Sequence, residues 1–271
     1  MKIRGVEMEQ KELFSREKLL KLILPLVVEQ LLSVTVGMAD MIMVSGAGEA
    51  AVSGISLVNT ICVLLIMMFS ALASGGAAVS AQYLGSKDKE SACKSANQLV
   101  LICFLASAAI MIFSLLANRW LLNLIYGNVE KDVMDNAVTY FYITAISFPF
   151  LAIYNACAGL FRSMNNSKIS MLVSVAMNVI NIAGNAALIY GFSMGVAGVG
   201  YATLLSQAVA CVIMLILIRK PKYEIHITSH RKLGWFPQII RNILHIGVPL
   251  LMNRHLWKHL TMERSMQPDL M

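Results

Sequence analysis

Two carboxylates, Glu29 and Asp40, are the side chains of this sequence best placed to do chemistry. They lie in the stretch LPLVVEQLLSVTVGMADMIMVSGAG, Leu24–Gly48, which is otherwise almost entirely apolar. None of the other acidic residues, of which the chain has 15 in all, falls inside a long apolar run. A carboxylate is costly to hold in hydrocarbon, so acids placed there usually serve a binding site or an ion pathway.

Glu29 and Asp40 share one face of a helix if this stretch is helical. Eleven positions at about 100° per residue leave about 20° of net rotation, with about 16 Å between the two along the axis. Ser33 and Gly37 fall on the same stripe. We expect this stripe to face a water-filled cavity or another polar helix, because lipid would leave the acids unsatisfied.

A second polar stripe is a run of asparagines in VAMNVINIAGNAALIYG. Asn178, Asn181 and Asn185 recur at the i, i+3 and i+7 positions of one helix face. Amides inside a membrane need partners in the protein, so this face is the expected partner of Asp40. The alternative interpretation is that the asparagines only join helices to one another.

Asp40 among Asn181, Asn185 and Thr203 would form a site for a coupling ion. In a cavity of low dielectric constant a carboxylate can hold a proton near neutral pH, which would link transport to a proton gradient. Sodium is the competing possibility, because carboxylate, amide and hydroxyl oxygens are also ligands for a hard cation.

Two further residues of the first apolar stretch have predicted roles. Pro25 removes a backbone hydrogen bond near the start of the helix and can act as a kink or hinge. Glu29 lies nearer the cytoplasmic end, where it either lines the mouth of a cavity with its charge directed to water or belongs to the functional site.

The segments that position these residues are six predicted membrane spans. The chain of 271 residues is 58% hydrophobic and 14% charged, whereas soluble domains carry about a quarter charged residues. Apolar runs of about 20 residues are long enough to cross a bilayer. We therefore predict an all-α membrane protein, a six-helix bundle with spans at 19–44, 53–81, 98–117, 137–161, 169–190 and 196–218.

The basic residues between the spans predict the orientation in the bilayer. The N-terminal tail and every second connector hold six, three, two and six Lys or Arg residues, against none, two and none in the alternate connectors. Cytoplasmic connectors carry the excess of positive charge. We expect a multi-pass protein of the cytoplasmic membrane, with a cytoplasmic N-terminus and no cleaved signal peptide because the first 18 residues are polar.

The chain divides into four predicted parts: a cytoplasmic segment at 1–18, the six-helix lobe at 19–219, a basic cytoplasmic linker at 220–242 and a divergent end at 243–271. ILHIGVP, Ile243–Pro249, resembles LLKLILP, Leu19–Pro25, which predicts the start of a second repeat. The polar tail after Met252 forbids a complete seventh span. The pattern indicates a truncated or frameshifted product, or else a genuine cytoplasmic end.

Other function classes find little support in the sequence. The net charge of +7 is spread over connectors rather than gathered on a basic face with aromatics, so no nucleic-acid partner is expected. The five cysteines show no metal-ligand spacing. The phosphate-binding, zinc-protease and serine-hydrolase motifs are missing, so we expect neither an enzyme nor a bound cofactor or metal.

Several segments together resemble the N-terminal lobe of the multidrug and toxic compound extrusion (MATE) family. They are the first apolar stretch, AQYLGSKDKE, GLFRSMNNSK, NVINIAGNAALIYG and GVAGVGYATLLSQ, and the resemblance extends over about residues 15–252. It implies a twelve-helix transporter built of two six-helix lobes that exports cationic or amphipathic compounds in exchange for protons or sodium ions.

The resemblance also implies roles for individual residues. Asp40, Asn181 and Thr203 match a polar cluster of the N-terminal lobe, and Pro25 matches a proline associated with bending. Some members carry aspartate where this chain has Asn185. The cluster therefore has one titratable group, and the coupling ion, proton or sodium, stays open. Because a second lobe is missing, the alternative function is an inactive or accessory membrane lobe that needs a second lobe or another copy to transport.

Overall fold

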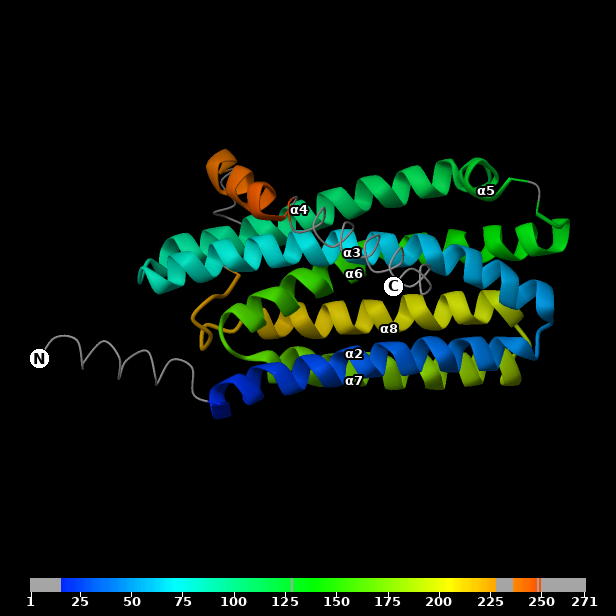
Figure 1. Ribbon diagram of the computed structural model, residues 1–271, viewed down its shortest axis with the longest axis horizontal. Helices are drawn as coiled ribbons and strands as arrows, with labels where there is room; N and C mark the ends of the chain where they lie inside the picture. The colour runs from blue at the N-terminus through cyan, green and yellow to red at the C-terminus, as the bar shows by residue number, and fades with distance from the viewer. Residues whose placement is uncertain (1–15, 128, 228–235, 248, 250–271) are drawn as a thin grey trace, which may run out of the picture.

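The computed structural model describes residues 16–127, 129–227, 236–247 and 249, and within these ranges it contains helices but no strand. Long helices run back and forth beside one another, joined by short connections at the two ends of the bundle (Figure 1). They are α2 (Arg16–Ser45), α3 (Glu49–Gly85), α4 (Lys89–Leu116), α5 (Asn118–Tyr126), α6 (Lys131–Ser163), α7 (Ser167–Ala186), the π-helical turn η1 (Ala187–Gly191) and α8 (Gly195–Ile218).

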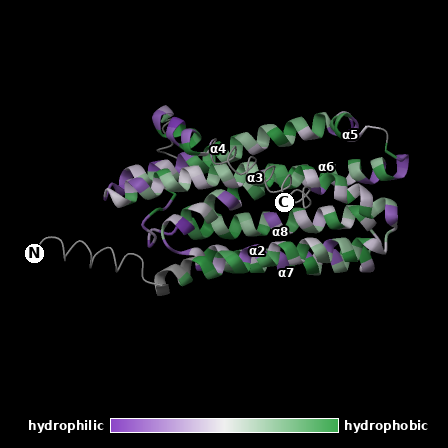
Figure 2. Ribbon diagram, in the orientation of Figure 1, coloured by the Kyte–Doolittle hydropathy of each residue, from purple (hydrophilic) through white to green (hydrophobic). Residues whose placement is uncertain are grey.

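Six membrane-crossing segments are present in the described part of the chain, as the sequence predicted. They are α2, α3, α4, α6, α7 with η1, and α8, and their most apolar windows have mean hydropathy between 1.6 and 2.8. Hydrophobic residues predominate along these helices, and hydrophilic residues concentrate near their ends (Figure 2). The predicted all-α bundle of six spans is therefore confirmed.

The helices extend beyond the predicted spans at several ends. α4 begins at Lys89 rather than at 98, because Asp88 caps its first turn by accepting a hydrogen bond from the Ser91 amide at 3.0 Å. Hydropathy marks only the apolar part of such a helix. α5 was not predicted at all, because it is short and lies within what the sequence indicated only as a connector, 118–136.

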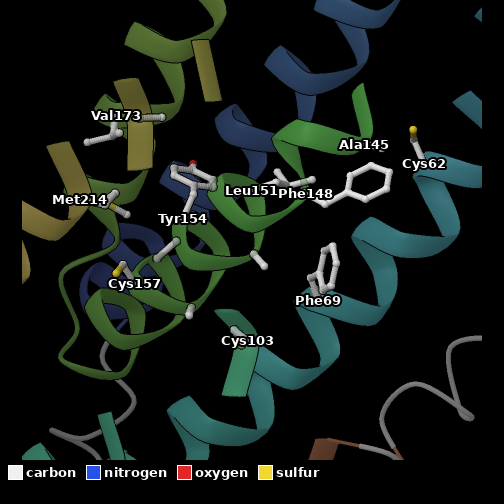
Figure 3. Close-up of a cluster of buried hydrophobic side chains, with 14 of the residues drawn as sticks. Cys62, Phe69, Cys103, Ala145, Phe148, Leu151, Tyr154, Cys157, Val173 and Met214 are labelled. Carbon is white, nitrogen blue, oxygen red and sulfur yellow. The ribbon is translucent and has the colours of Figure 1, made fainter. Parts of the chain in front are cut away.

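α6 is the core of the bundle. Within its most apolar window 78% of the residues are buried, against 6% for α2, and it packs against α3, α4 and α8. Its buried side chains include the small Ala145 and the aromatic Phe148, which lie in one cluster (Figure 3). Figure 3 also shows Phe69 of α3 and Met214 of α8 in the same buried cluster. α6 thus fixes the frame on which the outer helices are placed.

α3 and α6 touch through their backbones at Gly54. A β-carbon added at Gly54 would lie 2.9 Å from both Ala137 N and Val133 O of α6. Such distances are shorter than any ordinary van der Waals contact, so only glycine allows this approach.

The segment after α8 contains a further helical stretch. Residues 237–247 are helical, whereas the sequence predicted a linker up to 242, and the earlier start follows from Pro237, a residue favoured in the first helical position. This helix packs closely on α3, since a β-carbon at Gly75 would lie 2.7 Å from Gly247 N. The polar tail after Met252 and most of the predicted segment 1–18 lie outside the described residues.

The Gly54 contact predicts that Gly54→Ala lowers the thermal stability of the protein. The added methyl group must push α3 away from α6, at a cost of about 1–3 kcal/mol. The matched control is Gly85→Ala in the same helix, where nothing lies within 4 Å of the new atom. The five cysteines are all buried and free, so a thiol-reactive dye reports unfolding in detergent. If the midpoint temperature of unfolding for Gly54→Ala is equal to or above that of Gly85→Ala, the close contact at Gly54 is contradicted.

Candidate functional site

The structure places Asp40 against the asparagine face of α7. α2 lies along α7 (Figure 1), and the Asn185 side-chain amide donates a hydrogen bond to Asp40 Oδ1. Asn185 is completely buried, and Asp40 is partly buried. The acid of α2 is therefore paired inside the protein rather than directed at lipid.

The hydrogen bonds continue from α7 to α8. Asn185 Nδ2 donates to Asn181 Oδ1 at 3.3 Å, and Asn181 Nδ2 donates to Thr203 Oγ1 at 3.3 Å. Both hydrogens of the Asn185 amide are used, one on Asp40 and one on Asn181. Four of the residues that the sequence singled out thus form one polar chain across three helices.

This polar chain borders a cavity of about 290 Å³ between α2, α3, α6, α7 and α8. The sequence did not identify its walls from α3 and α6, where Tyr140 Oη donates to Asn59 Oδ1 at 3.3 Å. Tyr140 and Thr144 stand one helical turn apart, as do Thr203 and Gln207. That i, i+4 polar spacing is the signal that could have revealed these residues.

Several polar atoms around this cavity have no hydrogen-bond partner. Three of them, Asn178 Nδ2, Thr144 Oγ1 and Gln207 Oε1, belong to residues that line the cavity, and all three are buried. The buried Asn185 Oδ1, in the polar chain behind the lining, also lacks a partner. Buried polar groups are nearly always satisfied, so such atoms indicate room for water, an ion or a solute. Asn178 lies on the predicted stripe and lines the cavity, but it contributes no link to the chain that begins at Asp40.

Glu29 belongs to a different polar cluster. Tyr154 Oη donates to Glu29 Oε1 at 3.2 Å, Ser170 Oγ lies 3.3 Å from Oε2, and Arg162 Nη1 lies 3.8 Å from Oε1. The Glu29 side chain is 20% exposed, so it is held within the bundle rather than extended into water. Both acids of α2 contact α7, as expected for one stripe, yet their partners differ.

Arg162 was counted from the sequence as a charge in the connector 162–168. It lies instead in the last turn of α6, where it reaches Glu29. No periodic pattern links Arg162 to Glu29, because the two residues come from different helices far apart in the sequence.

Pro25 lies inside α2, which is helical on both sides of it. The predicted hinge at Pro25 stays a prediction.

A family model named MatE matches residues 25–187, more than half of the chain, from within α2 to just past the end of α7. The chain therefore belongs to the MATE family of transporters. Members of this family are transporters rather than enzymes, and the six apolar helices make this chain an integral multi-pass membrane protein.

Individual relatives agree with this membership. The chain is 28% identical over 229 residues to the uncharacterized transporter YisQ of Bacillus subtilis (strain 168), covering 83% of the chain and 50% of YisQ. It is 26% identical over 242 residues to the probable multidrug resistance protein NorM of Thermotoga maritima, covering 86% of the chain and 50% of NorM. The chain spans about half the length of the curated relatives it matches.

Solved structures show the same fold. A crystal structure of a MATE protein in the bent conformation superposes with a TM-score of 0.82 at 23% identity, over 88% of this chain and 53% of that one. An inward-facing MATE structure superposes with a TM-score of 0.75 at 24% identity, over 85% of this chain and 53% of that one.

The Asp40–Asn185 hydrogen bond predicts energetic coupling between these residues. A double-mutant cycle of Asp40→Ala and Asn185→Ala should give a coupling free energy of about 1.5–3 kcal/mol, the range for hydrogen bonds to charged groups. Unfolding of the purified protein in mixed detergent micelles provides the free energies.

The matched control pairs Asp40→Ala with Asn136→Ala, since the Asn136 amide bonds to Asp132 O within its own helix. That cycle should be additive within about 0.5 kcal/mol. Equal coupling in both cycles would show that Asn185 has no specific interaction with Asp40.

Proposed function

We propose that this chain is a lobe of a secondary antiporter that exports cationic or amphipathic compounds in exchange for protons or sodium ions. The observation that carries the proposal is the single carboxylate of Asp40, hydrogen-bonded by Asn185 at the wall of a cavity between membrane-spanning helices. Ionisable residues in such positions commonly mark substrate or ion pathways. The printed names of relatives such as NorM and the multidrug export protein MepA support an export function.

The chemistry of the site explains how exchange would arise. Asp40 can be neutralised by a proton, by Na⁺ or by a cationic substrate, and occupation by one disfavours the others. For Na⁺, the oxygens of Asp40, Thr203 and Asn185 would supply ligands, and Asn185 Oδ1 has no partner at present. Because Asn185 is an amide, the cluster has one ionisable group and would exchange one positive charge per cycle.

Transport also needs access to the cavity from both sides of the membrane in turn. Lobes of such transporters rock against one another around a central site. We assign the hinge of α2 to Pro25, which leaves one backbone carbonyl without its usual helical donor. The distribution of Lys and Arg supports a cytoplasmic N-terminus in the cytoplasmic membrane.

A second candidate function follows from length. Because the chain spans about half of its curated relatives, it would be a lobe that transports only when paired with a second lobe or with another copy of itself. The relevant partners are then a lipid bilayer, a small organic cation and that second lobe.

The export proposal predicts that Asp40→Asn abolishes gradient-driven efflux. The purified chain is reconstituted into liposomes that are loaded with ethidium. The efflux of ethidium is then followed after a proton or a sodium gradient is imposed. We expect gradient-dependent efflux that falls by at least about tenfold in Asp40→Asn, equivalent to about 1.4 kcal/mol. Asp135→Asn is the matched control. Asp135 lies away from the cavity, where its carboxylate forms an ion pair of 3.2 Å with Arg119.

The same assay separates the two candidates. Efflux by the chain alone supports a self-sufficient exporter, and efflux only after co-reconstitution with the second half of a relative supports the paired lobe. Efflux that ignores both gradients, or that Asp40→Asn leaves intact, would contradict ion coupling at Asp40.

A further inference from the structure

A second cavity lies beside the first, at the end of the bundle that carries Glu29 and the last turn of α6. Its volume is about 510 Å³, against about 290 Å³ for the cavity at Asp40. The two cavities share wall residues, among them Ser33, Asn178 and Gln207. Most residues lining the second cavity are polar, and it contains charges of both signs.

The negative charge of this cavity is fixed in place. Tyr154 Oη binds Glu29 Oε1 at 3.2 Å, and Ser170 Oγ lies 3.3 Å from the other oxygen. Because the Ser170 hydroxyl also donates to Ser167 O at 3.0 Å, the bond that holds the carboxylate is the one from Tyr154 of α6. A group held in this way is preorganised to receive a cation.

The positive charge is less engaged. Arg162 Nη1 lies 3.8 Å from Glu29 Oε1, which is an ion pair but too long for a hydrogen bond. The guanidinium therefore does not spend its hydrogen-bond donors on Glu29. Guanidinium is the side-chain group best shaped to bind a carboxylate or phosphate with two parallel bonds.

The inner wall of the cavity has polar atoms that lack partners. Asn178 is 8% exposed, and its Nδ2 donor has no hydrogen-bond partner. The acceptor Gln207 Oε1 is likewise buried and without a partner. Both side chains line this cavity, so a donor and an acceptor are available to a solute that reaches past the charged pair.

We propose that this second cavity binds a small zwitterionic solute, with its anionic group on Arg162 and its ammonium group on Glu29. A solute with only a positive charge can pair with Glu29 alone, and one with only a negative charge with Arg162 alone. A zwitterion satisfies both charges, and Asn178 and Gln207 bind its polar remainder. The proposal concerns binding alone and does not require that Asp40 couples transport to an ion.

Three indole compounds that differ in charge test this proposal. Tryptophan is a zwitterion at pH 7, tryptamine a cation and indole-3-propionate an anion. Equilibrium dialysis against the purified chain in lipid nanodiscs, without any gradient, gives the three affinities. We expect tryptophan to bind at least about tenfold more tightly than either of the other two.

Charge variants then assign the two poles of the site. Arg162→Gln should lower the affinity for tryptophan by about tenfold or more, so that tryptamine binds more tightly than tryptophan. Arg162→Lys, which keeps the positive charge, should restore part of the lost affinity. In Glu29→Gln, indole-3-propionate should instead bind more tightly than tryptophan. The control Arg119→Gln removes an arginine of α5 that pairs with Asp135, and it should leave the order unchanged.

A reversal of preference cannot come from misfolding, which would lower all three affinities together. No binding of tryptophan, equal affinity for the three compounds, or a parallel loss in both variants would overturn the proposal. Because no gradient is used, these outcomes are separate from those of the efflux experiment on Asp40.

Discussion

A polar group placed in hydrocarbon must find its partner within the protein, and the arrangement of α2 follows from this constraint. α2 is the least buried of the spans, and its outer face exposes Leu24, Leu31 and Met38, each about 60% or more exposed. Its opposite face carries Glu29 and Asp40. Since neither acid is stable against lipid, α2 must lie with that face on α7, where Ser170 and Asn185 receive them.

The two polar clusters depend in turn on a rigid interior. α6 packs against α3, α4 and α8 through small residues and aromatic rings, and it supplies Tyr140 to one cavity and Tyr154 with Arg162 to the other. The cavities are therefore bordered on one side by a fixed helix and on the other by α2. Exposed apolar residues spaced seven apart on α2 suit contact with lipid or with a second lobe.

The sequence was sufficient for the spans and for one of the two clusters. Long apolar runs define membrane helices strongly, and the asparagine periodicity identified the face of α7 that meets Asp40. Prediction from the sequence failed where no local pattern of residues exists. The short helix α5 is too small to stand out, and hydropathy ignores polar helix ends such as the first turns of α4.

Tertiary placement explains the remaining misses. Arg162 reads as a connector charge because its partner Glu29 lies more than a hundred residues earlier in the chain. Tyr140 and Asn59 likewise meet only after α3 and α6 have packed. Such pairs carry no signal in a single sequence, since each residue alone fits an ordinary helix.

The most direct test of the account is the distance between the Asp40 carboxyl carbon and the Asn185 side-chain nitrogen in a lipid bilayer. Solid-state NMR of protein carrying ¹³C in aspartate and ¹⁵N in asparagine measures it through their dipolar coupling. We expect a strong coupling that disappears in Asn185→Leu. A spectrum without that coupling, or one in which Asn185→Leu leaves it unchanged, would show that α2 does not place its acid on α7.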